Sequence, residues 1–236
     1  MILSITGSDN QTSISELNSF HDKNLHFELG LLYYPEKEGT PRNPTFEWRE
    51  RFFNMIDKNH IALHLCGEEI FRSILSQGFE QSSTAQEFKK ANRIQININA
   101  RKSIFTHEEI HEIYSKLIKI DCRLIIQYND TSKAWILPFL DSNPNLLNHI
   151  DMLLDSSLGK GIVASDFFIP QELQQYSFKY GFAGGISIEN IEDIHNKVRL
   201  LGVEYWLDLE SGARTNNVFD LEKAYKLSSL VKSSTN

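Results

Sequence analysis

Residues Ile94 to Asn99 read Ile-Gln-Ile-Asn-Ile-Asn, a strict alternation of isoleucines with amide side chains. Successive side chains of a β-strand point to opposite faces, so this stretch predicts a strand with one apolar face and one amide face. In a barrel of parallel strands, helices cover the outside and pack against the apolar face. We therefore expect the amides of Gln95, Asn97 and Asn99 to point into such a barrel.

Seven further apolar runs flank this stretch at regular intervals. All eight runs are Ile2–Thr6, Phe27–Tyr34, Ile61–Cys66, Ile94–Ile98, Arg123–Tyr128, Ile150–Asp155, Phe178–Ala183 and Val203–Leu209. Helix candidates separate them: Ser13–Asp22, Phe46–Asp57, Glu68–Leu75, His107–Lys119, Ala134–Leu140, Gln171–Gln174, Ile188–Leu201 and Leu221–Val231. This order predicts one α/β domain over residues 1–236, a parallel eight-stranded (β/α)8 or TIM barrel, with a frayed tail from Ser228. A doubly wound open sheet is second choice, because no early Gly-x-Gly-x-x-Gly is present.

Composition narrows the class of protein. Hydrophobic residues make up 41% of the chain and charged residues 23%, and the net charge is −7. The acidic balance and the lack of a basic run with interleaved aromatics argue against nucleic acid as a partner. No stretch approaches the roughly 18 apolar residues of a membrane helix, and we see no signal peptide. Cys66 and Cys122 are far apart in apolar runs, which suits a reducing compartment. We expect a cytoplasmic protein that does not bind membranes.

The alternation places more polar side chains inside the barrel. They are Gln127 and Asn129 of the fifth run, Asp151 and Asp155 of the sixth, and His64 and Cys66 of the third. Taken singly, Asp151 and Gln95 favour a buried polar network that fixes strand register. Amides and a carboxylate gathered at the carboxyl ends of strands instead predict a ligand site, because barrel active sites lie there.

Three strand ends carry candidate chemistry. The sixth run ends at Asp155, an acid able to keep or lose a proton near neutrality, and Gly159-Lys160-Gly161 follows it. That tripeptide is either an anion-binding loop or a plain turn. Gly184-Gly185 follows the seventh run, and Ser211-Gly212 follows Asp208 of the eighth. Loops after strands seven and eight form the recurrent phosphate site of this fold, and the alternative is tight strand–helix packing.

These stretches resemble the phosphoribosylanthranilate isomerase family. Leu153-Leu154-Asp155 with Gly159-Lys160-Gly161 is similar to its Leu-Leu-Asp…Gly-Thr-Gly, and the run from Ala183 to Ile191 is similar to its Ala-Gly-Gly-Leu-x-Pro-Glu-Asn-Val. Asp208-Leu209-Glu210-Ser211-Gly212 is similar to its Asp-x-x-Ser-Gly, and Pro41-Arg42 to the Pro-Arg pair after its second strand. The resemblance is good over Ile150 to Asp220 and patchy before that.

The resemblance implies roles for these positions. Asp155 would be the general acid that opens the ribose ring, and Arg42 would hold the anthranilate carboxylate. Phosphate and substrate binding would fall to Gly159, Gly161, Gly184, Gly185, Asp208, Ser211 and Gly212.

The sequence departs from the family where the general base belongs. The family has a cysteine at the end of its first strand, and this chain has Thr6 there. A threonine hydroxyl is a very weak base without an activating partner. Cys66 or His64 could supply a relocated base. Arg214 and Phe219 also replace the residues usual in the family at their positions.

The prediction that follows is an enzyme for a phosphorylated sugar conjugate, related to a step of tryptophan biosynthesis, with an aldose–ketose (Amadori-type) isomerisation by general acid and base. A different phosphosugar enzyme, or a non-catalytic barrel that binds a phosphometabolite, remain alternatives because of Thr6. We expect no cofactor and no metal, since lone His and Cys residues in strands are more often core. The predicted partner is a small phosphorylated molecule, and the protein a monomer or homodimer.

Overall fold

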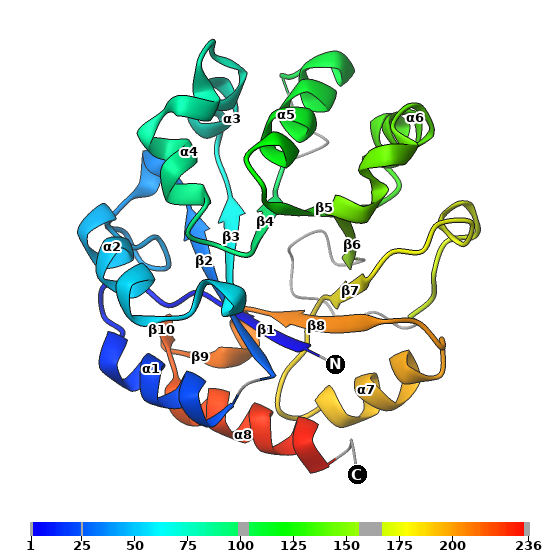
Figure 1. The fold of residues 1–236 in the computed structure, drawn as a ribbon. Coiled ribbons are helices and arrows are strands. Elements are labelled where there is room, and N and C mark those ends of the chain that lie inside the picture. The colour runs from blue at the N-terminus through cyan, green and yellow to red at the C-terminus, as the bar shows by residue number, and fades with distance from the viewer. Residues whose placement is uncertain (1, 25, 99–103, 156–166, 234–236) are drawn as a thin grey trace.

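The computed structural model describes residues 2–24, 26–98, 104–155 and 167–233. Eight parallel strands close into a barrel in chain order (Figure 1), which confirms the predicted fold class. The strands are β1 Ile2–Thr6, β2 Phe27–Tyr33, β3 Ile61–Leu65, β4 Arg93–Ile96, β5 Arg123–Tyr128, β6 Ile150–Asp155, β7 Tyr180–Ala183 and β8 Tyr205–Leu209. A two-stranded antiparallel hairpin, β9 Arg214–Thr215 and β10 Val218–Phe219, follows β8.

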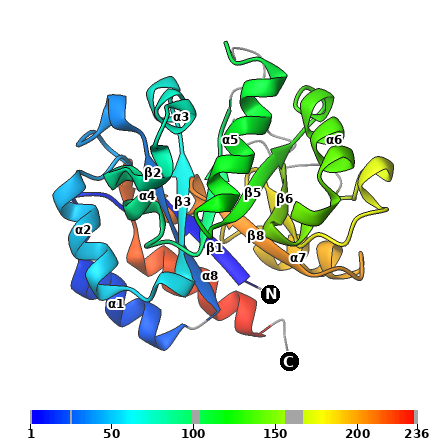
Figure 2. The same cartoon turned by 45° about the horizontal axis from the view of Figure 1, so that its top comes forward.

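Helices surround the strands (Figures 1 and 2). The α-helices are α1 Ile14–Lys23, α2 Phe46–Met55, α3 Glu68–Leu75, α4 Ser83–Phe88, α5 His107–Lys119, α6 Lys133–Ser142, α7 Ile191–Arg199 and α8 Leu221–Ser233. Short 3-10 helices are η1 Pro35–Lys37, η2 Lys58–His60, η3 Phe79–Gln81, η4 Pro144–His149, η5 Gln171–Leu173 and η6 Ser211–Ala213. No helix in these ranges is both long and apolar enough to span a bilayer.

Several segments differ from the sequence prediction, among them α4, which no helix candidate covered. The segment from Gln171 forms only the 3-10 helix η5, so β6 and β7 are joined without an α-helix in the described residues. Helix α7 begins at Ile191 instead of Ile188, because Asn190 and Ser187 hold a turn before it. The frayed tail expected from Ser228 was wrong over residues 228–233, which continue α8. Ser228 is buried there, and its hydroxyl donates to Asn24 Oδ1.

The strands separate two apolar cores. The larger core lies between the strands and the helices and takes one face of every strand, as with Leu3, Leu29 and Ile94. A small cluster of Ile125, Leu153 and Trp206 comes from the opposite face, and Ala183 packs against it. Buried polar side chains such as Ser4, Glu28 and Arg93 also lie on that inward face. Polar groups therefore lie inside the barrel, whereas the helices pack against its outer face.

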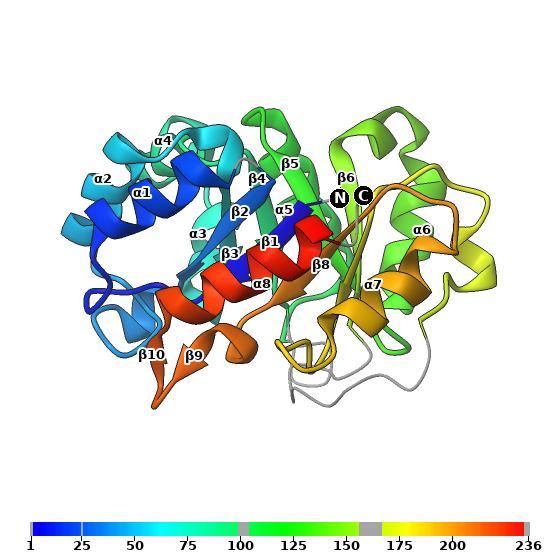
Figure 3. The same ribbon diagram turned by 90° about the horizontal axis from the view of Figure 1, so that it is seen from below.

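The two ends of the barrel are distinct. Figure 3 shows the β9–β10 hairpin at the end opposite the N-terminus of β1, where the strands finish. Helices α1 and α8 lie side by side across the strands in the same view. The carboxyl ends of the strands are where the candidate catalytic and binding residues lie.

Candidate active site at the carboxyl ends of the strands

Two carboxylates face the barrel interior on one row of the sheet. Asp155 at the end of β6 is in register with Ala183 of β7, and Ala183 is in register with Asp208 of β8. Neighbouring strands lie about 4.8 Å apart, so the two acids are separated by about 10 Å at their Cα atoms. Both side chains are buried, with 7% of Asp155 and 9% of Asp208 exposed. Ala183, which lies between them in the sheet, contributes only a methyl group.

Asp155 is held by the neighbouring strand. The Gln127 amide donates a hydrogen bond of 2.9 Å to Asp155 Oδ2, so Gln127 points inward as predicted. Asn129 does not join them, and that expectation was wrong. Its Oδ1 accepts hydrogen bonds from the backbone N–H groups of Thr131 and Ser132, because Asn129 lies beyond β5 in the turn that starts α6.

Asp208 has a pKa suited to proton transfer at neutral pH. Its pKa is raised to about 7, chiefly by burial and then by the negative charge of Glu28. The Arg93 guanidinium and a hydrogen bond with Ser4 act in the opposite direction, while Glu210 adds to the increase. Asp208 Oδ1 is buried, and no described residue donates a hydrogen bond to it. The sequence marked Asp208 only as a binding residue.

Thr6, in the position of the family base, contacts a histidine. Its Oγ1 lies 3.4 Å from His64 Nε2, and both side chains are buried inside the barrel. The contact requires Gly30, because a Cβ there would lie 2.0 Å from Thr6 Oγ1 and 2.9 Å from His64 Nε2. Burial lowers the pKa of His64 to about 4, against the opposing charge of Glu28. His64 is thus neutral and only weakly basic at pH 7.

Cys66 lies just beyond β3 and is partly buried. The Asn97 amide donates to its Sγ at 3.4 Å, and Gln95 in turn donates to Asn97 Oδ1 at 2.8 Å. The inward orientation predicted for these two amides is confirmed by this chain of contacts, whereas Asn99 lies outside the described residues. Burial raises the pKa of Cys66 to about 11, so it is almost entirely a thiol at neutral pH.

The loops after β7 and β8 are packed against each other. A Cβ at Gly212 would lie 2.2 Å from the Ile186 carbonyl oxygen, so only glycine allows this approach. Gly184 and Gly185 have φ angles of 112° and 62°, which L-residues rarely adopt. Within the described part of the chain, nothing accepts a hydrogen bond from the amide groups of these three glycines. Gly159 and Gly161, predicted to join them, lie outside the described residues.

Arg42 is brought to the end of β8, although 168 positions separate it from Glu210 in the sequence. Its guanidinium forms an ion pair of 3.0 Å with Glu210, and its backbone N–H donates to Asp9 Oδ2 at 2.7 Å. The Arg214 guanidinium donates to the carbonyl of Gly7 and lies 3.4 Å from Asp9. Burial raises the pKa of Glu210, and the two arginines oppose that effect. The predicted carboxylate anchor thus already holds an internal carboxylate.

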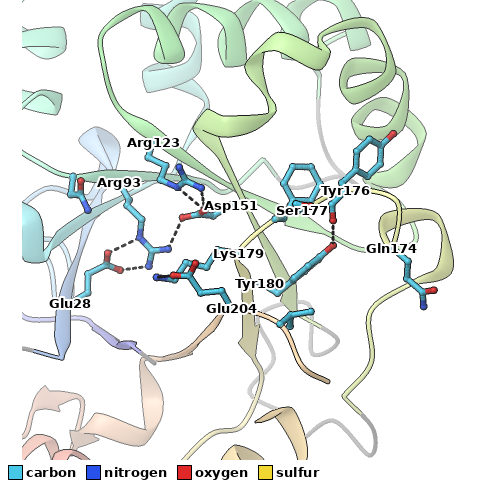
Figure 4. Close-up of a pocket in the computed structure, with 13 residues that line it drawn as sticks. Glu28, Arg93, Arg123, Asp151, Gln174, Tyr176, Ser177, Lys179, Tyr180 and Glu204 are labelled. Atoms are coloured by element: carbon cyan, nitrogen blue, oxygen red, sulfur yellow. Dashed lines mark hydrogen bonds and ion pairs between the residues drawn. The ribbon is translucent and has the colours of Figure 1, made fainter. Parts of the chain in front are cut away.

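The opposite end of the barrel has a cavity of about 730 Å³, drawn in Figure 4. Arg93 lies between Glu28 and Asp151, at 2.7 and 3.0 Å, and Arg123 pairs with Asp151 at 2.7 Å. Arg93 also stacks over the Trp206 ring at 4.2 Å. This arrangement confirms the buried polar network expected for Asp151.

The cations of this cavity are already neutralised. Burial alone favours the protonated form of Glu28, but Arg93 outweighs it and lowers the pKa of Glu28. Lys179 pairs with Glu204 at 3.0 Å at the rim. Such a network closes the amino end of the barrel and fixes strand register, a structural role typical of that end. The candidate site residues lie at the other end, at the carboxyl ends of the strands.

A family model for N-(5'-phosphoribosyl)anthranilate isomerase matches residues 103–230, more than half of the chain. The chain belongs to the N-(5'-phosphoribosyl)anthranilate isomerase family. The match includes α5 and continues into α8, and so contains Asp155, Gly184, Asp208 and Ser211. No curated protein matches the chain in sequence.

Solved structures of the isomerase family share the fold over its whole length. The phosphoribosyl anthranilate isomerase of Thermus thermophilus is 17% identical, with a TM-score of 0.59 and 99% of both chains covered. That of Pyrococcus furiosus is 16% identical, with a TM-score of 0.56 and the same coverage. The fold extends beyond this family: a phospho-2-dehydro-3-deoxyheptonate aldolase from Thermotoga maritima is 13% identical, with a TM-score of 0.61, 99% of this chain and 68% of that chain covered.

The candidate site contains residues that the sequence predicted and others that it did not. Asp155, the glycine loops and Arg42 lie at the predicted end of the barrel. The described residues contain no group of three or more His, Cys, Asp or Glu side chains placed to hold a metal ion. Gly30 and Asp9 were missed. Their signals were a glycine within an apolar strand and an aspartate directly after the first strand.

Proposed function

We propose that this protein isomerises a phosphorylated aldosylamine to the corresponding aminoketose, with phosphoribosylanthranilate as the first candidate substrate. The observation that carries the proposal is the row of Asp155, Ala183 and Asp208 at the same barrel end as the glycine loops after β7 and β8. A substrate of this class has a phosphate at one end and a reacting C1–C2 unit near the other.

The phosphate would bind at the loops after β7 and β8. The backbone N–H groups of Gly184, Gly185 and Gly212 have no acceptor among the described residues, and α7 begins a few residues after Gly185, at Ile191. Amide groups and the positive end of a helix stabilise a phosphate. The Ser211 hydroxyl would add a further hydrogen bond.

Asp155 would act as the general acid. Protonation of the ribose ring oxygen breaks the C1–O bond and leaves an iminium ion at C1. The Gln127 amide holds one oxygen of Asp155 and orients the carboxyl group toward the space beside Ala183. An aromatic carboxylate on the substrate would pair with Arg42 and displace Glu210 from it.

The test is turnover of phosphoribosylanthranilate by the wild type and by Asp155→Asn, followed by chromatography of substrate and ketose product. We expect the wild type to turn over, and the variant to lose activity by about 10²- to 10⁴-fold, because an amide cannot protonate the ring oxygen. An inactive wild type would contradict the proposal for this substrate.

Phosphate binding is tested separately with ribose 5-phosphate by calorimetry. Gly185→Asp should lose binding, since its carboxylate blocks the amides and repels the ligand. Gly202→Asp is the matched control, because Gly202 also has a positive φ of 67° but lies at the end of α7 with open space around it. Equal affinity in both folded variants would remove the phosphate site.

A second candidate is a non-catalytic barrel that binds a phosphometabolite. It is favoured by Thr6 in the base position, since His64 and Cys66 are both poor bases at neutral pH. Phosphate binding without turnover or proton exchange by the wild type would support it.

A further inference from the structure

The unanswered chemical question is which group removes the C2 proton. Thr6 has no basic side chain, the pKa of His64 is low at about 4, and that of Cys66 is high at about 11. Two further acids near the ends of β1 and β8 are engaged by cations, Glu210 by Arg42 and Asp9 by Arg214. The proposed isomerisation needs a base that is substantially ionised at neutral pH and is reachable from the same space as Asp155.

Asp208 and Asp155 lie on opposite sides of Ala183 in the sheet. The two acids are partners of the same residue, Ala183, one from each neighbouring strand. Both side chains therefore project from the same face of the sheet, with only a methyl group between them. An acid and a base that flank a substrate C1–C2 unit require this kind of separation.

The surroundings of Asp208 leave one oxygen ready to accept a proton. Its Oδ1 is buried, and no described residue donates a hydrogen bond to it. On the other side, Ser4 is in register with both Asp208 and Glu28, and the Ser4 hydroxyl donates to Glu28 Oε1 at 3.0 Å. Glu28 is itself fixed by Arg93. Ser4, Glu28 and Arg93 therefore form hydrogen bonds with one another beside Asp208, and the Asp208 Oδ1 atom has no partner among the described residues.

We propose that Asp208 is the general base of this site and replaces the missing first-strand cysteine. The inference rests on the proposed isomerase function. After Asp155 has opened the ring, the Asp208 carboxylate takes the C2 proton of the iminium ion. The C–H electron pair forms the C1=C2 bond, and the C1=N pair returns to nitrogen. The protonated Asp208 then returns a proton to C1 while the ionised Asp155 takes the enol O–H proton, which gives the aminoketose and restores both acids without any oxidant or cofactor.

The pH dependence follows from the groups that face Asp208. Glu28 of β2 and Glu210 after β8 raise its pKa, Arg93 of β4 and Ser4 of β1 lower it, and β7 contributes the uncharged Ala183. With a pKa of about 7, the base is protonated and inactive at lower pH, so kcat/KM should rise with pH through about 7. Ser4→Ala removes a hydrogen bond that favours the carboxylate, and should move this limb to higher pH.

The decisive experiment compares two reactions of the wild type, Asp155→Asn and Asp208→Asn. The first reaction is turnover of phosphoribosylanthranilate. The second is exchange of the C1 protons of ribulose 5-phosphate with D2O, followed by NMR. Ribulose 5-phosphate cannot close a furanose ring because its O5 carries the phosphate, so its exchange needs a base but no ring-opening acid. Asp130→Asn, which removes a fully exposed carboxylate, is the control.

We expect Asp155→Asn to lose turnover and keep exchange, and Asp208→Asn to lose both by about 10²- to 10⁴-fold. Asp208→Asn should keep its affinity for ribose 5-phosphate to within a few-fold and remain folded, which separates a lost base from a lost structure. The less drastic Asp208→Glu should keep part of the exchange activity.

The remaining outcomes separate this inference from the function itself. If Asp208→Asn keeps the turnover of the wild type, Asp208 is not the base. The same holds if proton exchange is lost in His64→Gln or Cys66→Ser and not in Asp208→Asn. Either result leaves the proposed isomerase function in place. Exchange that depends on Asp208 without turnover would support the base and reject the substrate. A wild type without either reaction would overturn both proposals.

Discussion

Thr6 Oγ1 and His64 Nε2 lie 3.4 Å apart over Gly30, on three adjacent strands of the barrel. The contact fills the place where the family has its catalytic cysteine. A buried imidazole with a pKa of about 4 accepts a hydrogen bond from a hydroxyl but does not deprotonate it at neutral pH. The pair therefore packs the barrel interior and provides no effective base at neutral pH.

Gly30→Ala should destabilise the protein by roughly 1 to 3 kcal/mol, because the added methyl group overpacks the contact between Thr6 and His64. The Cβ would lie 2.0 Å from Thr6 Oγ1. The double variant Gly30→Ala/Thr6→Ala should recover part of the loss, since the hydroxyl is then gone. Urea unfolding of the single and double variants measures this, and strictly additive effects would show that the two positions do not compete for space.

Thr6→Cys should change kcat/KM for phosphoribosylanthranilate by less than about tenfold. With Asp208 as the base, a thiol at position 6 adds a second and redundant proton acceptor. Steady-state kinetics of the two proteins provide the measurement. A gain of 10² or more, the size of a general-base contribution, would indicate that the wild-type site has no base.

Asp208→Asn should stabilise the protein while it removes activity. The pKa of this carboxyl group rises from an ordinary 3.8 to about 7 in the folded protein, so the folded state binds the proton more tightly than the unfolded state. The wild type should therefore lose stability as the pH rises from about 4 to about 7. At pH 8 the wild type should have lost free energy of unfolding on the order of a few kcal/mol, and the variant should show no such loss.

Thermal unfolding of the wild type and Asp208→Asn at pH 5 and pH 8 tests this linkage. The melting temperatures should differ more at pH 8, with the variant higher. A variant that is less stable than the wild type at pH 8 would indicate a structural role for the Asp208 carboxylate and not a functional one.

Glu210→Gln should strengthen the binding of ligands that carry a carboxylate. In the wild type such a ligand must displace Glu210 from Arg42. We expect KM for phosphoribosylanthranilate to fall several-fold, while the affinity for ribose 5-phosphate, which has no carboxylate, stays the same. Arg42→Ala should raise KM for the same substrate, and equal KM values in all three proteins would show that Arg42 does not contact it.

The sequence by itself determined the barrel and the end of it at which the candidate site residues gather. Alternation in residues such as Ile94, Gln95 and Ile96 separates the helix-facing side from the interior because strand geometry is local. Asp155, Gly184 and Ser211 follow strands six, seven and eight, and parallel strands bring their carboxyl ends to one edge. No long-range information was needed for either conclusion.

Only the tertiary structure decided how these groups behave. The pKa of Asp208 depends on burial and on the charges of Glu28 and Arg93, which come from distant strands. The ion pair of Arg42 with Glu210 and the contact of Thr6 with His64 likewise join residues far apart in the chain. Electrostatic energy depends on distance in space and on exclusion of water, and neither is encoded in sequence separation. Asp208 therefore became a candidate for the base only from the tertiary structure of the closed barrel.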